Sequence, residues 1–353
     1  MKFGIFIPQG WRHDLVGIDP SQHWGVMAGL AKRADMHDVW TSIWVYDHFH
    51  PVPQPTQEAT HEAWSLMAAL GAATSRVRIG QMCTCMAYRN PAYLAKVAAT
   101  VDMISEGRLE MGIGAGWYEH EWRAYGYGFP RAGERLGMLR EGVDIMRQMW
   151  TTGYGRLDGK HYQVDGAMCF PRPLQGTSSP GSKANGIPMW IAGGGEKVTL
   201  RIAAEYADYT NFFGSPEEFA HKNELLKAHC KDIGRDESEI VRSSNFDLVI
   251  GHSQAEIDDR LAGIAGRMVA GGVDQATVDQ RLAGVKDSLG CGTPEQITER
   301  LLQMQTAGMT YAIVNFAEAA YDVSGIELFE REVIPHLVDR DEHGHLWHLL
   351  HGR

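Results

Sequence analysis

Short, continuously apolar segments alternate with longer amphipathic segments along most of the chain. Strands that are buried on both faces produce such apolar runs, whereas an apolar position every three or four residues is typical of helices that cover a sheet. Eight segments are predicted to be strands: 3–8, 39–46, 77–83, 109–113, 188–192, 209–213, 240–250 and 311–316. The pattern therefore indicates an α/β protein.

Helical periodicity follows each predicted strand. Helices are predicted over residues 22–36, 62–74, 92–104, 134–150, 197–206, 216–231, 293–307 and 326–337. Eight strands that are each followed by a helix favour a (β/α)₈ TIM barrel over an open doubly wound sheet, which is the alternative. We expect a single barrel domain over residues 1–340 and a His-rich tail over residues 341–353.

Two segments interrupt this alternation and are expected to be insertions into the barrel. Residues 154–188 are rich in Gly, Pro and Ser, which predicts a hairpin and a flexible loop. Residues 254–288 are predicted to hold two additional helices.

Composition and charge narrow the classes of partner. The net charge of −11 over 353 residues disfavours nucleic acid and anionic membranes, because both require clustered Lys and Arg. The chain has no apolar run long enough to span a bilayer, and its first residues are expected to form a core strand rather than a cleavable signal. Of the five cysteines, Cys83 and Cys85 are expected on opposite faces of one strand and the others are isolated, which predicts reduced thiols and a cytoplasmic location.

Two predicted strands end in glycine-rich segments, and strand ends are where barrel enzymes build their sites. Residues 112–116 read Gly-Ile-Gly-Ala-Gly, so a flat or phosphorylated ligand could lie against bare backbone, although the spacing is not that of a dinucleotide fingerprint. Residues 191–197 lead three glycines into a helix whose backbone N–H groups could hold a phosphate, with Lys197 adding a charge. A tight turn without a ligand is the alternative at both places.

A histidine motif, Asp-His-Phe-His, follows the second predicted strand at residues 47–50. His48 could transfer a proton or donate to a ring, with Asp47 setting its orientation or charge. A structural histidine is one alternative, and a metallohydrolase that uses His48 and His50 as ligands is another. The later strand ends offer a poor ligand set for a hydrolytic metal, so no metal is expected. That set consists of Cys83, glycines, Asn211 and Asn315.

Aromatic residues near the predicted strand exits could wall a pocket for a planar ligand, although core packing is the alternative for each of them. The candidates for the substrate pocket are Trp11, His13, Trp117 and Tyr118. The candidate proton donors are His48, Glu119, His120 and Glu121.

Six motifs together resemble the luciferase-like flavin and deazaflavin oxidoreductases. They read KFGIFIP at 2–8, WVYDH at 44–48, NPAYLAK at 90–96, SEGRLEMGIGAGW at 105–117, IAGGG at 191–195 and GTPEQI at 292–297. The resemblance extends from residue 1 to about residue 337 and implies a (β/α)₈ barrel with insertions. Within this superfamily, Asp47-His48 resembles the branch that uses the deazaflavin coenzyme F420, whereas FMN-dependent relatives more often carry other residues there.

The resemblance also implies roles for individual residues. Asp47 and His48 would face the deazaflavin ring, and a non-proline cis peptide between Met82 and Cys83 would form a bulge behind it. The wall along the ring or ribityl chain would consist of Gly114, Ala115 and Gly116. The phosphate site would consist of Gly194, Gly195, Glu196 and Lys197, acting mainly through backbone amides. A homodimer is usual in the superfamily.

The chain departs from the F420-dependent sugar-phosphate dehydrogenases at two positions. It has Trp117 where they place a glutamate, and Val52 where they place a tryptophan. We therefore expect a small, apolar or aromatic organic substrate, with hydride transfer to or from the deazaflavin C5 and with His48 handling a proton or stabilising charge. The remaining alternatives are an FMN-dependent monooxygenase and a non-catalytic coenzyme-binding barrel.

Overall fold

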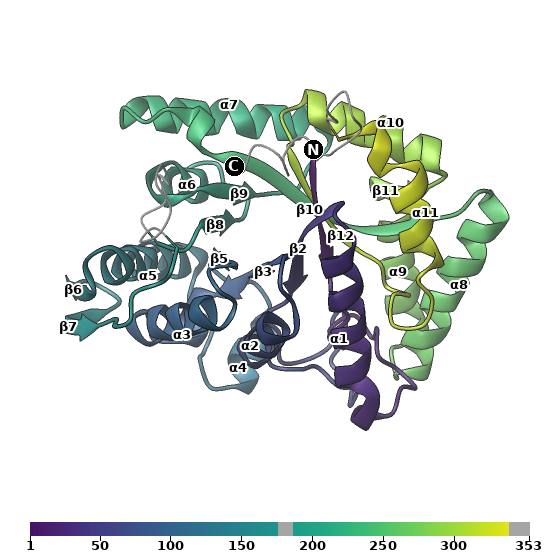
Figure 1. Ribbon diagram of the computed structural model, residues 1–353, viewed down its shortest axis with the longest axis horizontal. Coiled ribbons are helices and arrows are strands. Elements are labelled where there is room, and N and C mark those ends of the chain that lie inside the picture. The colour runs from purple at the N-terminus through teal and green to yellow at the C-terminus, as the bar shows by residue number, and fades with distance from the viewer. Residues whose placement is uncertain (176–185, 339–353) are drawn as a thin grey trace.

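Eight parallel strands close into a barrel in the computed structural model, which describes residues 1–175 and 186–338 (Figure 1). The barrel strands are β1 (Lys2–Phe6), β2 (Trp40–Val45), β3 (Arg78–Gln81), β5 (Leu109–Gly114), β8 (Met189–Ala192), β9 (Tyr209–Asn211), β10 (Val241–Ile250) and β12 (Tyr311–Asn315). Each strand pairs in parallel with the next, and β1 closes the barrel by pairing with both β2 and β12. The predicted (β/α)₈ barrel is confirmed, and the open-sheet alternative is excluded.

The helices that follow the strands surround the barrel (Figure 1). They are α1 (Pro20–Met36), α2 (Ala63–Ala73), α3 (Pro91–Ile104), α5 (Ala132–Thr152), α6 (Thr199–Tyr206), α7 (Pro216–Asp232), α10 (Pro294–Thr306) and α11 (Ser324–Glu332). Local sequence fixes where several of them begin. Asn90 caps α3 with Pro91 at its first position, and Thr293 with Gln296 forms a capping box at α10.

Two segments interrupt the alternation of barrel strands and helices. The first holds an antiparallel hairpin of β6 (Tyr154–Asp158) and β7 (Gln163–Met168), and the second holds α8 (Gln254–Ala270) and α9 (Gln275–Lys286). Within 154–188, residues 176–185 lie outside the described residues, as does the His-rich tail. Short elements were not predicted because they show no periodicity. They are α4 (Glu119–Ala124), β4 (Thr84–Cys85), β11 (Gly290–Gly292) and the 3₁₀ turns Met86–Tyr88, Glu237–Glu239 and Ile334–His336.

The third strand differs from its prediction. It ends at Gln81 rather than Cys83, and the Met82–Cys83 peptide bond is cis, as the resemblance implied. Because the strand does not run on, the expected alternation of Cys83 and Cys85 across two faces is wrong. Both residues line the same cavity, which is described below. All five cysteines are free.

Large aromatic side chains fill the interior of the barrel. Trp190 stacks on Tyr209 with ring centroids 4.1 Å apart, and Trp44 meets Trp190 edge to face at 4.7 Å. The buried Glu110 accepts a 2.6 Å hydrogen bond from Trp190 Nε1 and pairs with Arg78. Because these side chains occupy the barrel interior, they form a floor beneath the carboxyl ends of the strands.

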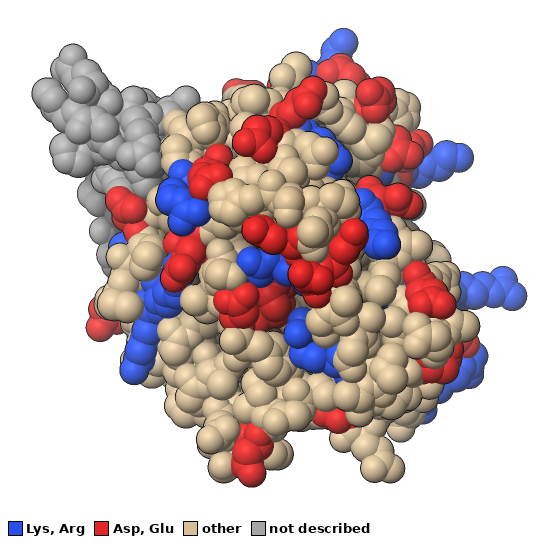
Figure 2. All heavy atoms as spheres, turned by 90° about the vertical axis from the view of Figure 1, so that its right-hand side faces the viewer, with Lys and Arg blue, Asp and Glu red and all other residues tan. Residues whose placement is uncertain are grey.

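The outer surface carries mixed charge. Figure 2 shows the face over α8, α9 and α11, where acidic and basic side chains are interspersed with uncharged ones. No helix in the described part of the chain is long and apolar enough to cross a membrane.

Close packing of β5 against β3 generates a stability prediction. A Cβ added at Gly112 would lie 1.8 Å from the Gln81 carbonyl oxygen, and a backbone atom cannot move aside as a side chain can. We expect Gly112→Ala to lower the free energy of unfolding by about 3 kcal/mol or more, measured by urea denaturation.

Gly29→Ala is the matched control for this substitution. Gly29 lies in α1 with open space around its missing Cβ, so alanine there is expected to stabilise the protein by about 0.5–1 kcal/mol. A Gly112→Ala protein as stable as the wild type would contradict the packing that the structure assigns to these two strands.

Candidate active site

A cavity of about 400 Å³ opens at the carboxyl ends of the barrel strands. It is lined by residues that follow β1, β2, β3, β5, β8 and β9, together with Asn245 from within β10. The sequence-predicted site residues that line it are Trp11, Asp47, His48, Met82, Cys83, Gly114, Ala115, Gly116, Trp117 and Tyr118. Most of the strand exits singled out from the sequence therefore meet in one place.

His48 is held in the cavity wall by a buried carboxylate. Its Nδ1 lies 2.9 Å from Oε2 of Glu121, a residue of α4 that has no solvent exposure. An ionised carboxylate only accepts hydrogen bonds, so Nδ1 carries the hydrogen and Nε2 is the acceptor of the neutral ring. Nε2 has no hydrogen-bond partner among the described residues, so it is the ring atom available to a ligand.

Glu121 also organises the backbone around His48. Its Oε1 accepts hydrogen bonds from the backbone N–H groups of Phe49 at 2.8 Å and His50 at 2.9 Å, and the Tyr88 hydroxyl donates to Oε2 at 3.2 Å. Burial acts to raise the pKa of Glu121, but the hydrogen bond from His48 and those from the backbone outweigh it and hold the pKa below 4.5. Glu121 is therefore ionised at neutral pH.

The other proton-donor candidates lie elsewhere on α4. Glu119 is exposed and pairs with Arg123 at 2.7 Å, and the exposed His120 packs its ring against His50 and Tyr118. The structure thus brings only Glu121, of these three, into contact with His48.

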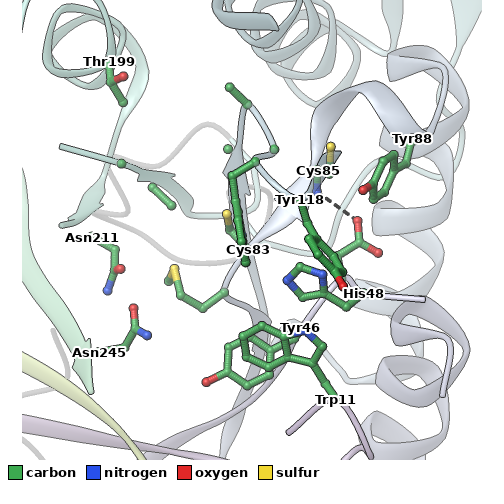
Figure 3. Close-up of a pocket in the computed structure, with 18 of the residues that line it drawn as sticks. Trp11, Tyr46, His48, Cys83, Cys85, Tyr88, Tyr118, Thr199, Asn211 and Asn245 are labelled. Carbon is green, nitrogen blue, oxygen red and sulfur yellow. Dashed lines mark hydrogen bonds between the residues drawn. The ribbon is translucent and has the colours of Figure 1, made fainter. Parts of the chain in front are cut away.

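Aromatic rings enclose the imidazole of His48 (Figure 3). Trp11 stacks on it with centroids 4.4 Å apart and planes 6° from parallel. Trp117 and Tyr118 approach it edge to face at 5.8 and 6.0 Å. The ring is consequently fixed in orientation on several sides.

Asp47 has a different role from its neighbour. Its buried carboxylate forms a two-pronged ion pair with Arg89, at 2.7 and 2.9 Å, and accepts the Cys85 backbone N–H at 2.9 Å, the contact dashed in Figure 3. These contacts tie the exit of β2 to the segment after β3. Asp47 therefore positions the cavity wall, and its charge is directed at Arg89.

The two cysteines pack against the glycine-rich exit of β5. A Cβ at Gly114 would lie 2.8 Å from Cys83 Sγ, and one at Gly116 would lie 2.5 Å from Cys85 Sγ. Gly116 also has a φ of +76°, which favours glycine. Burial, with a smaller contribution from the Asp47 charge, raises the pKa of Cys83 to about 12, so its thiol is neutral and unreactive near pH 7.

The second glycine run reaches the cavity only in part. Gly193 and the hydroxyl-bearing Thr199 line it, whereas Gly194, Gly195, Glu196 and Lys197 lie beyond its lining. Helix α6 begins at Thr199, two residues later than predicted, because residues 196–198 form a turn. The backbone N–H groups of Gly194 and Gly195 have no acceptor within the described ranges, so they remain available as donors to a ligand.

The remaining candidate, His13, lies outside the cavity. It is buried, with a φ of +57°, and its Nε2 lies 3.2 Å from the Thr56 hydroxyl. Sequence reasoning missed Arg12, Arg89 and Thr199. Arg12 adjoins the predicted Trp11 and Arg89 adjoins a helix cap, but neither position has a pattern that marks a functional arginine. Within residues 1–175 and 186–338, no group of three His, Cys, Asp or Glu side chains is arranged to hold a metal ion.

The chain belongs to the luciferase-like monooxygenase family, since the family model matches residues 1–311. The resemblance drawn from the sequence motifs is confirmed.

Two curated relatives illustrate the range of the family. The F420-dependent glucose-6-phosphate dehydrogenase of Amycolatopsis mediterranei (strain U-32) is 33% identical over 169 residues, which cover 47% of this chain and 45% of that protein. The pyrimidine monooxygenase RutA of Serratia proteamaculans (strain 568) is 31% identical over 246 residues, 67% of this chain and 64% of that protein. The chain spans about half to two thirds of the length of such relatives.

Solved structures share the fold over nearly the whole chain. An F420-dependent secondary alcohol dehydrogenase in complex with an F420-acetone adduct superposes with a TM-score of 0.74 at 23% identity, covering 96% of this chain and 99% of that one. The F420-dependent tetrahydromethanopterin reductase from Methanopyrus kandleri gives 0.71 at 20% identity, covering 95% and 99%.

The buried Glu121 generates a pH-dependent prediction. Glu121→Gln leaves His48 Nδ1 without a charged acceptor and should lower the free energy of unfolding by about 2 kcal/mol at pH 7. Because the pKa of Glu121 is lower in the folded than in the unfolded chain, its charge stabilises the fold above pH 4.5, and this contribution is lost as the pH falls through the folded value. Urea unfolding from pH 3 to pH 8 should show the two proteins converge below pH 4.5.

Glu119→Gln, on the same helix, is the control for that comparison. Its carboxylate is exposed, so its stability should stay within about 0.5 kcal/mol of the wild type across this range. A constant difference between the Glu121→Gln protein and the wild type at all pH values would show that the Glu121 charge does not support the site.

Proposed function

We propose that the protein is a coenzyme F420-dependent oxidoreductase that transfers a hydride to or from a small organic substrate. The observation that carries the proposal is His48, oriented by Glu121 and presenting an unpartnered Nε2 at the wall of the cavity. F420-dependent dehydrogenases among the relatives support the choice of coenzyme.

The residues present suit a planar coenzyme with a phosphorylated tail. One wall consists of bare backbone at Gly114 and Gly116, with Met82 and Cys83 beside it, so a flat ring can approach closely. On another side, the free N–H groups of Gly194 and Gly195 and the Thr199 hydroxyl are donors of the kind that bind phosphate. These two groups would hold the ring and the tail respectively.

When bound, F420 supplies a carbon that accepts or donates a hydride. The protein holds the two reactants, shields them from water and exchanges a proton. His48 Nε2 accepts a proton from the substrate in the neutral ring, or donates one after protonation, and Glu121 stabilises the imidazolium through Nδ1. Trp11 keeps the imidazole in place, while Trp117 and Tyr118 cover it and exclude water.

An FMN-dependent monooxygenase is the second candidate. It is favoured by the pyrimidine monooxygenases among the relatives, which include the match that covers 67% of this chain. Deazaflavins are poor activators of oxygen, so the identity of the coenzyme separates the two reactions.

Coenzyme binding is the first test. Titration of the apo-protein with F420 and with FMN, followed by fluorescence, should give clearly tighter binding of F420. Reduced F420 should then be oxidised in the presence of members of a panel of activated alkenes, imines and carbonyl compounds. Preference for FMN with oxygen consumption would favour the monooxygenase, and tight F420 binding without turnover would favour a non-catalytic coenzyme-binding barrel.

Substitution of His48 tests the proton-transfer role. His48→Asn keeps a side-chain N–H donor for Glu121 but cannot exchange a proton, so kcat should fall about 10²- to 10⁴-fold, while the F420 dissociation constant changes little. Glu119→Gln should leave both quantities unchanged. If the His48→Asn protein retains full kcat, His48 is structural rather than catalytic.

A further inference from the structure

Arg12 is a cationic side chain of the cavity that the proposed chemistry does not use. It follows Trp11 in the loop after β1 and lines both the main cavity and a small adjoining one, which is also lined by Asp247, Arg281 and Asn315. Its guanidinium carbon lies 4.0 Å from the centre of the Trp11 ring, and that same ring stacks on His48. Arg12 and His48 therefore share one aromatic neighbour.

The guanidinium of Arg12 has no hydrogen bond or ion pair within residues 1–175 and 186–338. Its Nε is buried without a partner. Three other arginines are paired instead, Arg89 with Asp47, Arg78 with Glu110 and Arg281 with Asp247. Arg12 as a whole is half-buried and lines the cavity, and only its Nε is fully removed from water. A buried N–H is costly unless an acceptor meets it, so an unmet one at a cavity wall indicates that the acceptor comes from a ligand.

The charged groups around Arg12 do not fill that role. Asp247 is occupied by Arg281 and Asn315. Asp14 accepts the Gly10 N–H at 2.6 Å, and burial raises its pKa to about 6. The positive charge of Arg281 and the hydroxyl of the buried Tyr46 also face Arg12, and neither is an anionic acceptor near pH 7.

The barrel separates Arg12 from the expected site of the coenzyme phosphate. In the closed strand order, β8 is the fourth strand from β1 in either direction, so the two lie on opposite sides of the barrel. Gly194 and Gly195 follow β8, whereas Arg12 follows β1 and contacts the same Trp11 ring as His48, which follows β2. An anion at Arg12 is therefore not the coenzyme phosphate held by the glycines.

We propose that Arg12 binds a carboxylate of the substrate, so that the substrate class is a planar, largely apolar molecule with one anionic end. This inference rests on the proposed function. The planar guanidinium matches a carboxylate with two parallel N–H···O bonds. The amide side chain of Asn245, from β10, lines the same cavity and is neutral, so it does not oppose the negative charge of a carboxylate (Figure 3). The aromatic wall beside His48 accepts the apolar body.

Benzoate and benzamide are the probes, because they have the same shape and differ in charge. In titrations followed by calorimetry, the F420-loaded wild type should bind benzoate at least tenfold more tightly than benzamide. Arg12→Met should abolish this preference and leave the dissociation constant of benzamide within about twofold of the wild-type value. Arg12→Lys should retain part of the preference. Arg123→Met, an exposed arginine paired with Glu119, is the control and should keep the wild-type preference.

Thermal unfolding adds a readout that a structural role would not give. Because Arg12 has no acceptor, Arg12→Met should unfold at the same temperature as the wild type or higher, and benzoate should raise the unfolding temperature of the wild type alone. Equal affinity for the two probes in the wild type, a preference retained by Arg12→Met, or a lowered unfolding temperature of that variant would overturn the proposal. Phenyl phosphate binding more tightly than benzoate, through Arg12, would replace the carboxylate by a phosphate and overturn the stated class.

The two proposals fail in distinguishable ways. If F420 binds and the benzoate preference is absent, only the role of Arg12 is wrong. If neither F420 nor FMN binds, the proposed function is wrong, and the benzoate titration of the apo-protein still reports on Arg12.

Discussion

One buried carboxylate sets the geometry of the cavity mouth. Glu121 joins α4 to the segment after β2 through His48 Nδ1 and two backbone N–H groups, and it reaches the segment after β3 through the Tyr88 hydroxyl. Loops at the open end of a barrel have no strand partners, so their positions depend on contacts of this kind. Because Glu121 accepts four hydrogen bonds while fully buried, it stays charged and holds three separate segments in register.

A second carboxylate, that of Asp47, also ties separate segments together. Asp47 binds Arg89 and the Cys85 backbone N–H, which fixes the segment after β3 against the exit of β2. The two acids thus have different roles, which their positions in the sequence did not suggest. Asp47, next to His48 in the chain, shapes the wall, whereas Glu121, 73 residues away, orients the imidazole. Asp47 lines the cavity, whereas Glu121 lies behind His48 and outside the lining.

The fold could be predicted from the sequence because the apolar segments have the length and spacing of barrel strands, and the caps at Asn90 and Thr293 mark helix starts. The site could be predicted in part, because glycines and histidine at strand exits must converge in a closed barrel. The pairing of His48 with Glu121 could not be chosen from three adjacent candidates, because a six-residue helix has no visible periodicity and only its packing shows which residue faces inward. The same applies to Cys83 and Cys85, where the strand ends earlier than its apolar pattern.

The role of Arg12 also could not be predicted from the sequence. An arginine in sequence is usually solvated, and only the structure reveals one whose buried Nε has no acceptor. Arg12 and the glycine run after β8 lie at opposite sides of the cavity, so the two sides differ. The side at β1 has a guanidinium without an acceptor, and the side at β8 has backbone N–H groups without acceptors. His48, which follows β2 and contacts the ring that Arg12 covers, lies nearer the side at β1. A substrate anchored at Arg12 would therefore place its body against the aromatic wall and the imidazole, leaving the glycine-lined side to the coenzyme.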